Sequence, residues 1–259
     1  MATRLRTGDS RLAPVDPDEL ADLITDELRA VARPERAEQE KRYLKSELEF
    51  LGASVWEIRR VVQALTKGAP PLTHDRLTAL VEALWAEPLH ERRMAAVVLL
   101  ELHPKLLTPA DLPLLERLVR ESLTWALVDG LAGDVVGGIM AGSPAEARAV
   151  LDRWATDPDF WIRRTSLLAE LRPLRAGAEM APFLRRADAM LEEHEFFIRK
   201  AIGWVLREVG KRRPDEVATW LAPRTHRASG VTMREAVRYL PTGEGERLMA
   251  AYREKRPAG

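Results

Sequence analysis

The sequence lacks the residue types and patterns on which several large classes of protein depend. It has no cysteine among its 259 residues, which excludes a disulfide framework and thiolate chemistry. Its 40 basic and 40 acidic residues cancel, so any binding to nucleic acid or to a membrane must come from a local patch. The polar first 20 residues do not resemble a signal peptide, and no apolar run of about 18 residues stands out. We therefore expect a cytoplasmic protein without a membrane span.

Familiar catalytic patterns are missing as well. The sequence has no Gly-rich phosphate loop and no Ser/His nucleophile pattern. Metal-ligand spacing is absent from the five histidines, which are His74, His90, His103, His194 and His226. We expect neither a metal nor a cofactor.

Helix signals run along the whole chain. A capping residue followed by Pro at the first helical position recurs at Asp16-Pro17, Thr108-Pro109, Ser143-Pro144 and Asp157-Pro158. Apolar residues have helical spacing in 77–84 and 112–119, and no β-hairpin signal is convincing. Short linkers are predicted at Gly68-Ala-Pro-Pro71, Gly142-Ser-Pro144 and Arg172-Pro-Leu174. These patterns predict an all-α fold.

Tryptophans mark a loose internal period. Steps of 40, 36 and 43 residues separate Trp85, Trp125, Trp161 and Trp204, close to the roughly 40–47 residues of a HEAT-type helix pair. We predict a HEAT-like α-solenoid of antiparallel helix pairs with a concave, locally basic groove, and an ordinary helical bundle is the alternative. Residues 16–259 would form a single domain, and residues 1–15 a flexible N-terminal tail.

The predicted helix from Glu195 to Arg213 has two distinct faces. An apolar stripe is formed by Ile198, Ile202, Val205 and Val209, and nearly opposite it lie Lys200, Trp204, Arg207 and Lys211. Between residues 196 and 213, six basic side chains stand against one acidic side chain. This face is interpreted either as a nucleic-acid surface or as a solvated basic face with the indole packed under a neighbouring helix.

Two further positions are of interest on their helices. Trp125 and Asp129 share a face with Gly133, where a ligand backbone could approach closely. Their wheel positions alone do not mark them as catalytic. Arg164 lies at the end of an apolar stripe with Leu168 and Leu171, and an arginine there needs a partner. That partner is either a helix carboxylate or a bound phosphate.

These residues resemble the AlkD-like DNA alkylation repair glycosylases, which are HEAT-like solenoids. The resemblance covers about residues 37 to 222. Its longest stretches are Phe160-Trp-Ile-Arg-Arg-Thr165 and Phe196-Phe-Ile-Arg-Lys-Ala-Ile-Gly-Trp-Val-Leu-Arg-Glu208. Shorter matches are Lys41-Arg-Tyr-Leu-Lys-Ser46, Phe50-Leu-Gly52, Leu84-Trp85, Glu91-Arg92 and Trp125-Ala-Leu-Val-Asp129.

The resemblance implies roles for individual residues. It assigns the catalytic carboxylate to Asp129, the two flanking aromatics to Trp125 and Trp204, and a phosphate contact to Arg164. Further DNA contacts are expected at Tyr43, Lys45, Arg163, Lys200, Arg207 and Lys211. The family often places an aromatic residue before the catalytic Trp and an acid after it, whereas this chain has Thr124 and Ala126 there.

The activity implied by the resemblance is that of a monofunctional DNA glycosylase. It would hydrolyse the N-glycosidic bond of cationic N3- or N7-alkylated purines in duplex DNA, without flipping the base into a pocket. The protein is expected to act as a monomer on double-stranded DNA. The alternative is a non-catalytic HEAT-like module that binds a DNA structure or a protein partner.

Overall fold

The computed structural model describes residues 16–67 and 71–254, and the regular elements within these ranges are helical. The predicted tail at 1–15 and most of the linker at 68–71 lie outside the described residues. Contacts divide the chain into two compact units, Met1–Leu102 and His103–Gly259. The single domain expected over residues 16–259 stays a prediction.

The first unit is built from helices α1 (Pro17–Ala30), α2 (Pro34–Leu44), α3 (Val55–Lys67), α4 (His74–Trp85) and α5 (His90–Leu102). As predicted, α1 begins at Pro17, and the Asp16 carboxylate accepts a hydrogen bond from the backbone N–H of Asp18 at 2.9 Å. Helix α5 packs against both α3 and α4. Its middle, from Met94 to Leu100, is buried on all sides and forms the core of the unit.

A tight loop between α2 and α3 explains two short motifs of the sequence, Phe50-Leu-Gly52 and Glu91-Arg92. Gly52 has φ +84°, and a Cβ there would lie 2.3 Å from the Arg33 carbonyl oxygen, so only glycine fits. The fully buried carboxylate of Glu91 accepts hydrogen bonds from the backbone N–H groups of Leu51, at 3.0 Å, and Gly52, at 2.6 Å. Burial raises the pKa of Glu91, although these two hydrogen bonds oppose the shift.

The second unit carries the predicted site. Its α-helices are α6 (Leu112–Arg120), α7 (Trp125–Gly130), α8 (Gly137–Gly142), α9 (Pro144–Trp154), α10 (Phe160–Leu168), α11 (Leu171–Arg175), α12 (Ala181–Ala189), α13 (Phe196–Gly210), α14 (Pro214–Leu221), α15 (Gly230–Ala236) and α16 (Thr242–Glu254). Short 3₁₀ turns cover Pro104–Leu106, Pro109–Asp111, Ala222–Arg224 and Val237–Tyr239. A π-helical segment, Leu131–Val136, joins α7 to α8.

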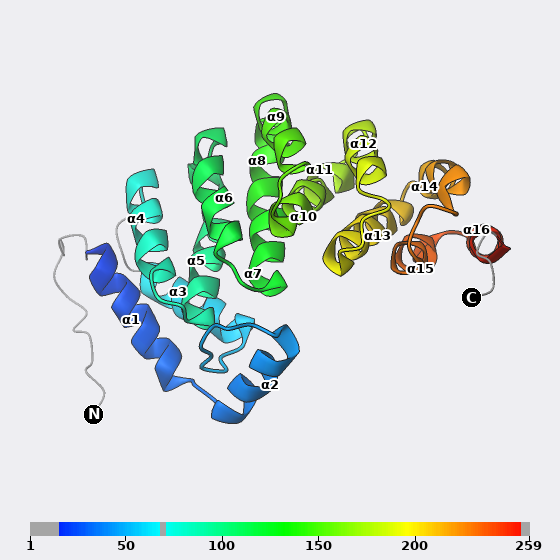
Figure 1. The fold of residues 1–259 in the computed structure, drawn as a ribbon. Helices are drawn as coiled ribbons and strands as arrows, with labels where there is room; N and C mark the ends of the chain where they lie inside the picture. The colour runs from blue at the N-terminus through cyan, green and yellow to red at the C-terminus, as the bar shows by residue number, and fades with distance from the viewer. Residues whose placement is uncertain (1–15, 68–70, 255–259) are drawn as a thin grey trace. The chain divides into compact units, whose positions relative to one another are not determined.

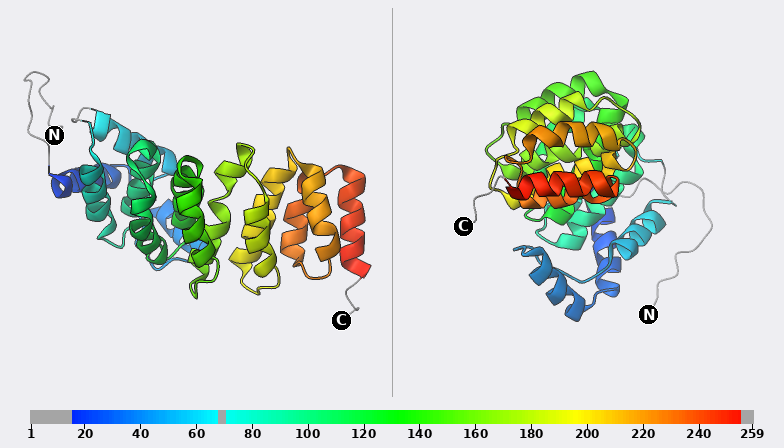
Figure 2. Two further views of the ribbon diagram at one scale, coloured as in Figure 1. Left: turned by 90° about the horizontal axis from the view of Figure 1, so that it is seen from above. Right: turned by 90° about the vertical axis from the view of Figure 1, so that its right-hand side faces the viewer.

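These helices form two layers (Figure 1). Helices α7, α10, α13 and α15 follow one another in contact along one layer, and α9 and α14 pack behind α10 and α13. Figure 2 shows the same stacking from above. The predicted all-α, helical-repeat fold is confirmed. The residues of interest on α7, α10 and α13 therefore come from successive helices of one layer.

A buried apolar cluster in this unit includes residues from Ala132 to Tyr252. The apolar stripe predicted on α13 lies entirely within it. Gly203 lets α15 approach α13, because a Cβ on Gly203 would lie 2.6 Å from the Cβ of Glu235 and 3.0 Å from the Thr232 carbonyl oxygen.

Two local predictions were wrong. The helix expected to start at Asp157-Pro158 begins at Phe160, and Asp159 caps it by accepting from the backbone N–H of Trp161 at 2.8 Å. The Asp157 carboxylate instead pairs with Arg120 on α6. The stretch Arg172-Pro-Leu174 is not a linker but lies in α11, because proline is tolerated in the first turn of a helix. The predicted starts at Thr108 and Ser143 are confirmed.

Candidate active site

Trp125 and Asp129 lie on α7, and the chain before this helix is unusual. Leu123 has φ +53°, a left-handed conformation, and is half exposed. Thr124 then caps the helix, with its hydroxyl oxygen accepting from the backbone N–H of Ala126 at 3.4 Å. Trp125 is the first helical residue, and Asp129 follows one turn later.

The π-helical segment starts two residues after Asp129. Such segments are rare and occur frequently at functional sites. The wider turn of a π-helix changes which side chains share a face with Asp129. Both Gly133 and Asp134 border the same cavity as Asp129, although a regular helix would place Asp134 well away from it.

The Asp129 carboxylate is held by the Arg164 guanidinium from α10. Arg164 donates from Nε to Oδ1 at 2.8 Å and from Nη2 to Oδ2 at 2.9 Å. It also donates from Nη1 to the carbonyl oxygen of Phe197 at 2.5 Å. The side chain of Arg164 is 3% exposed and that of Asp129 16%. Of the two partners left open by the sequence, the structure supplies the helix carboxylate, and it is Asp129 itself.

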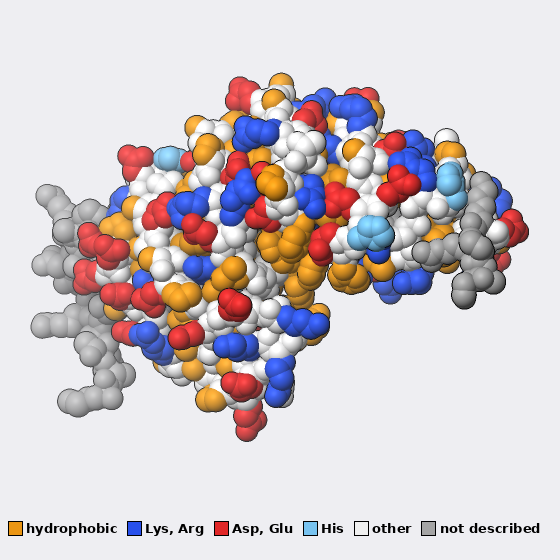
Figure 3. All heavy atoms as spheres, in the orientation of Figure 1, with side chains coloured by type: hydrophobic (Ala, Val, Ile, Leu, Met, Phe, Trp, Pro, Cys, Tyr) orange, Lys and Arg blue, Asp and Glu red, His pale blue; other side chains and the backbone are white. Residues whose placement is uncertain are grey.

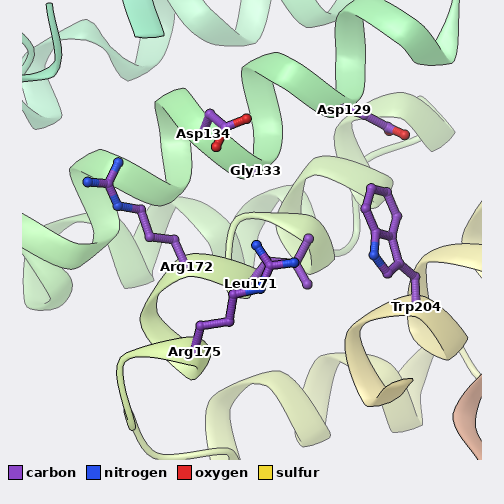
Figure 4. A pocket seen from close by; sticks show the side chains of 7 residues that line it. All are labelled: Asp129, Gly133, Asp134, Leu171, Arg172, Arg175 and Trp204. Carbon is purple, nitrogen blue, oxygen red and sulfur yellow. The ribbon is translucent and has the colours of Figure 1, made fainter. Parts of the chain in front are cut away.

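Asp129 borders a cavity of about 300 Å³ (Figure 4). The lining residues come from three places: Asp129, Gly133 and Asp134 from the α7–α8 helix, Leu171, Arg172 and Arg175 from α11, and Trp204 from α13. The structure thus brings Asp129 and Trp204, two residues that the family resemblance places together, to one cavity. Trp125 is half-buried one turn before Asp129 and is not one of these lining residues.

The basic face of α13 is less open than its sequence suggested. Both Lys200 and Arg207 pair with Glu235 of α15. Burial favours a higher pKa for Glu235, but the Lys200 hydrogen bond and the Arg207 charge outweigh it, so the pKa of Glu235 is lowered. Lys211 binds Glu208, at 2.8 Å. A charge count along α13 alone overlooks Glu235, which arrives from another helix.

Three other predicted DNA contacts lie elsewhere. Arg163 forms a bidentate ion pair with Glu193, at 3.0 and 2.8 Å, and also donates to backbone carbonyl oxygens in the loop just before α10. Tyr43, 72% exposed, and Lys45 lie at the end of α2 in the first unit. Lys45 has the left-handed φ of +49° that ends this helix.

Sequence reasoning missed an aromatic group beside the Asp129–Arg164 pair. The rings of Phe160, Trp161, Phe196 and Phe197 form a continuous chain of contacts with centroid separations of 4.4 to 6.2 Å. The Arg164 guanidinium lies 5.6 Å from the Phe197 ring centroid. Figure 3 shows hydrophobic side chains gathered on the surface where α10 and α13 begin. The doublets Phe160-Trp161 and Phe196-Phe197 at two helix starts were the available signal.

One expectation about membranes needs correction. The stretch Trp125–Gly142 is long and apolar enough to span a membrane by length and composition alone. Half of it is buried inside the protein, and it carries Asp129 in its ion pair with Arg164. Helices from the core of a folded unit pass the same test, so this stretch is weak support for a span. Among the described residues, no group of His, Cys, Asp and Glu could hold a metal ion.

The stacked helix pairs bring four groups to one cavity: the Asp129 carboxylate, the Trp204 indole and the guanidinium groups of Arg172 and Arg175. Together they define a helical-repeat protein with a polar, enzyme-like site. The chain belongs to the family of DNA alkylation repair enzymes, whose model matches residues 24–240.

Two solved structures are similar in fold. One is described as a predicted DNA alkylation repair enzyme from Enterococcus faecalis. It is 23% identical, covers 82% of this chain and 97% of its own length, and has a TM-score of 0.72. The other is the alkylpurine DNA glycosylase AlkC of Pseudomonas fluorescens bound to DNA containing an abasic site analog. It is 16% identical, covers 92% of this chain and 69% of its own, and has a TM-score of 0.48. No curated protein matches the chain significantly.

Proposed function

We propose that the protein is a monofunctional DNA glycosylase that removes cationic N3- or N7-alkylated purines from duplex DNA. The observation that carries the proposal is that Asp129, fixed by Arg164, borders the same cavity as the Trp204 indole. The reaction breaks the bond between C1′ of the deoxyribose and the purine nitrogen. The bonding electron pair leaves with the purine, which becomes neutral, while water supplies the oxygen that bonds to C1′ and releases one proton to solvent by way of the Asp129 carboxylate.

The residues present suit a reaction without a general acid. An alkylated purine already carries a positive charge, so its departure needs no proton. The remaining task is to stabilise an oxocarbenium-like sugar and to orient water, for which a carboxylate and an indole face are suitable groups. The cavity is at the lower end of the size range of ligand pockets and is shared with long cationic side chains. We propose, as the family resemblance implies, that the reaction does not require a base flipped into this cavity.

Arg164 limits the electrostatic contribution of its partner. A carboxylate about 4 Å from a unit positive charge contributes roughly 4 kcal/mol at an effective dielectric near 20, and a guanidinium about 8 Å away opposes this by roughly 2 kcal/mol. The indole face adds about 0.5–2 kcal/mol. The net stabilisation of about 2.5–4 kcal/mol corresponds to a rate factor of roughly 10² to 10³. Arg164 acts here as a positioning residue that fixes the carboxylate.

A phosphate would reach Arg164 only if its pair with Asp129 opened, because its guanidinium is almost fully buried. Phosphate contacts at Lys200, Arg207 and Lys211 are easier, since these side chains are 20% to 43% exposed. We propose that these three side chains bind phosphates of the DNA backbone. They do so either beside their carboxylate partners or in exchange for them.

The second candidate is a non-catalytic module that binds DNA structures. It is favoured by the same ion pair, because both oxygens of Asp129 are engaged and the pair has the geometry of a structural contact. Such a module would bind duplex DNA with an affinity that does not depend on alkylation.

The deciding experiment measures release of 7-methylguanine and 3-methyladenine from a methylated duplex. Asp129→Asn leaves the Arg164 charge beside the reacting sugar, so the single-turnover rate should fall about 10³-fold, the full effect of the lost carboxylate. The matched control is Asp215→Asn, an exposed carboxylate on α14, which should react like the parent protein. Full activity of Asp129→Asn would overturn the mechanism, and no base release by the parent protein would favour the binding module.

A further inference from the structure

Arg172 and Arg175 occupy one wall of the cavity and have no part in the chemistry proposed above. They stand three residues apart on α11, so they share a face of that helix. Both side chains are exposed, and both border the cavity together with Asp129 and Trp204 (Figure 4). Two guanidinium groups are thus placed beside the predicted reacting carboxylate.

Two glycines of α8 shape the site of Arg172. A Cβ on Gly137 would lie 3.0 Å from the Ala169 carbonyl oxygen and 3.4 Å from the Arg172 Cβ, so this glycine lets the backbones approach. A Cβ on Gly138 would lie 3.2 Å from Nη1 of Arg172, so the guanidinium lies against the bare backbone of α8. The Arg172 guanidinium thus lies beside helix backbone and not beside a counter-ion.

The two arginines differ in their partners. Arg175 donates to Glu208 at 3.0 Å, and Glu208 also binds Lys211. Arg172 forms no ion pair with any residue in the described ranges. Across the cavity, Asp134 is exposed and likewise has no ion-pair partner there. The cavity therefore has a cationic wall on α11 and one uncompensated carboxylate on the π-helical segment.

We propose that Arg172 and Arg175 form a phosphodiester subsite for the DNA phosphate next to the sugar that faces Asp129. This inference rests on the proposed function, because it places that sugar in the same cavity. A planar guanidinium matches two phosphate oxygens with two parallel N–H donors, and a pair of them separated by one helical turn can hold one phosphate from two sides. The Trp204 indole, on a third wall, would contact the sugar between the phosphate and Asp129.

The subsite assigns opposite roles to Arg172 and Asp134. Arg172 attracts the phosphate, whereas Asp134 repels it from across the cavity. Removing each charge should therefore change DNA affinity in opposite directions. If the cavity bound a cation or a neutral group instead, loss of the Arg172 charge would not weaken DNA binding while loss of the Asp134 charge strengthened it.

The test is equilibrium binding of a duplex that contains a tetrahydrofuran abasic analogue, at several salt concentrations, because binding does not require turnover. Arg172→Gln should bind about tenfold more weakly, and its salt dependence should lose about one counter-ion. Arg175→Gln should show a smaller loss, because Arg175 is shared with Glu208. Asp134→Asn should bind several-fold more tightly.

The matched control is Arg185→Gln on α12, an exposed arginine without an ion pair among the described residues. It removes the same charge from outside the cavity and should bind like the parent protein. Equal effects of Arg172→Gln and Arg185→Gln would overturn the subsite, as would weaker binding by Asp134→Asn. If the parent protein releases no base but Arg172→Gln still loses affinity and salt slope, the glycosylase proposal fails and the subsite stands. If base release is normal and Arg172→Gln binds normally, the subsite alone fails.

Discussion

Arg164 on α10 holds both carboxylate oxygens of Asp129 on α7, at 2.8 and 2.9 Å, while its third nitrogen binds the Phe197 carbonyl oxygen at the start of α13. One guanidinium therefore ties together three successive helices of the same layer. The carboxylate that the proposed reaction needs is also part of what fixes these helices.

Replacing Arg164 should destabilise the second unit. In Arg164→Met the carboxylate of Asp129 stays largely buried without its partner, and breaking such a pair costs about 3–5 kcal/mol. Urea unfolding followed by circular dichroism measures the loss. The double variant Asp129→Asn/Arg164→Met should recover part of it, since no uncompensated charge then remains. Additive losses in the double-variant cycle would mean that the two side chains do not interact in solution.

Gly133→Ala should separate stability from activity. A Cβ at this position meets only Leu171 Cδ1, at 4.0 Å, so the free energy of unfolding should be unchanged or higher by up to about 1 kcal/mol. If a DNA backbone approaches the cavity here, the methyl group should lower the rate of 7-methylguanine release about tenfold. Gly203→Ala is the contrasting variant. Its clash with α15 should lower the free energy of unfolding by about 1–3 kcal/mol.

Glu235→Gln should increase affinity for DNA. The change removes the carboxylate that pairs with both Lys200 and Arg207, so Lys200 becomes available to phosphates and Arg207 keeps only its longer contact of 3.6 Å with Glu208. We expect several-fold tighter binding of an unmodified duplex at low salt and a steeper dependence on salt concentration. Glu192→Gln, at a 67% exposed carboxylate on the loop before α13, is the control. An unchanged salt slope in Glu235→Gln would show that this face does not contact DNA.

The first unit should lose stability in mild acid because of His90. Burial lowers the pKa of His90 to about 4, whereas an unfolded histidine titrates near 6.5. Between these values the unfolded chain binds a proton that the folded chain does not, so the free energy of unfolding falls as the pH falls. The loss is complete near pH 4 and amounts to about 3 kcal/mol. His90→Phe keeps a ring against Phe50, 4.6 Å away in the parent protein, and should flatten the unfolding profile between pH 7 and 4.

The buried faces of the regular helices could be predicted from the sequence, because an α-helix turns by a fixed angle of about 100° per residue and this angle decides which side chains share a face. The stripe of α13 from Ile198 to Val209 is buried as expected. The same reasoning identified Arg164 as an arginine that needs a partner. It could not choose Asp129, because that carboxylate lies 35 residues earlier and meets Arg164 only through packing of two helices.

The remaining errors have related causes. A charge count along α13 could not include Glu235, which reaches Lys200 from α15. The linker predicted at Arg172-Pro-Leu174 lies within α11, where Pro173 stands in the first helical turn. As a result, the cationic wall of the cavity was missed. Asp134 was overlooked because a wheel drawn at 100° per residue does not describe a π-helix.

The π-helical segment Leu131–Val136 holds about one residue more than the same length of turn in an α-helix would. Deleting one residue there would allow an ordinary α-helix from Trp125 to Gly142 whose two ends keep nearly their present rotational phase. Asp129 would keep its pair with Arg164, and Gly137 its packing on α11, whereas Gly133 and Asp134 could no longer both face the cavity. The extra residue therefore determines which side chains line the cavity beside Asp129 and leaves the Asp129–Arg164 pair in place.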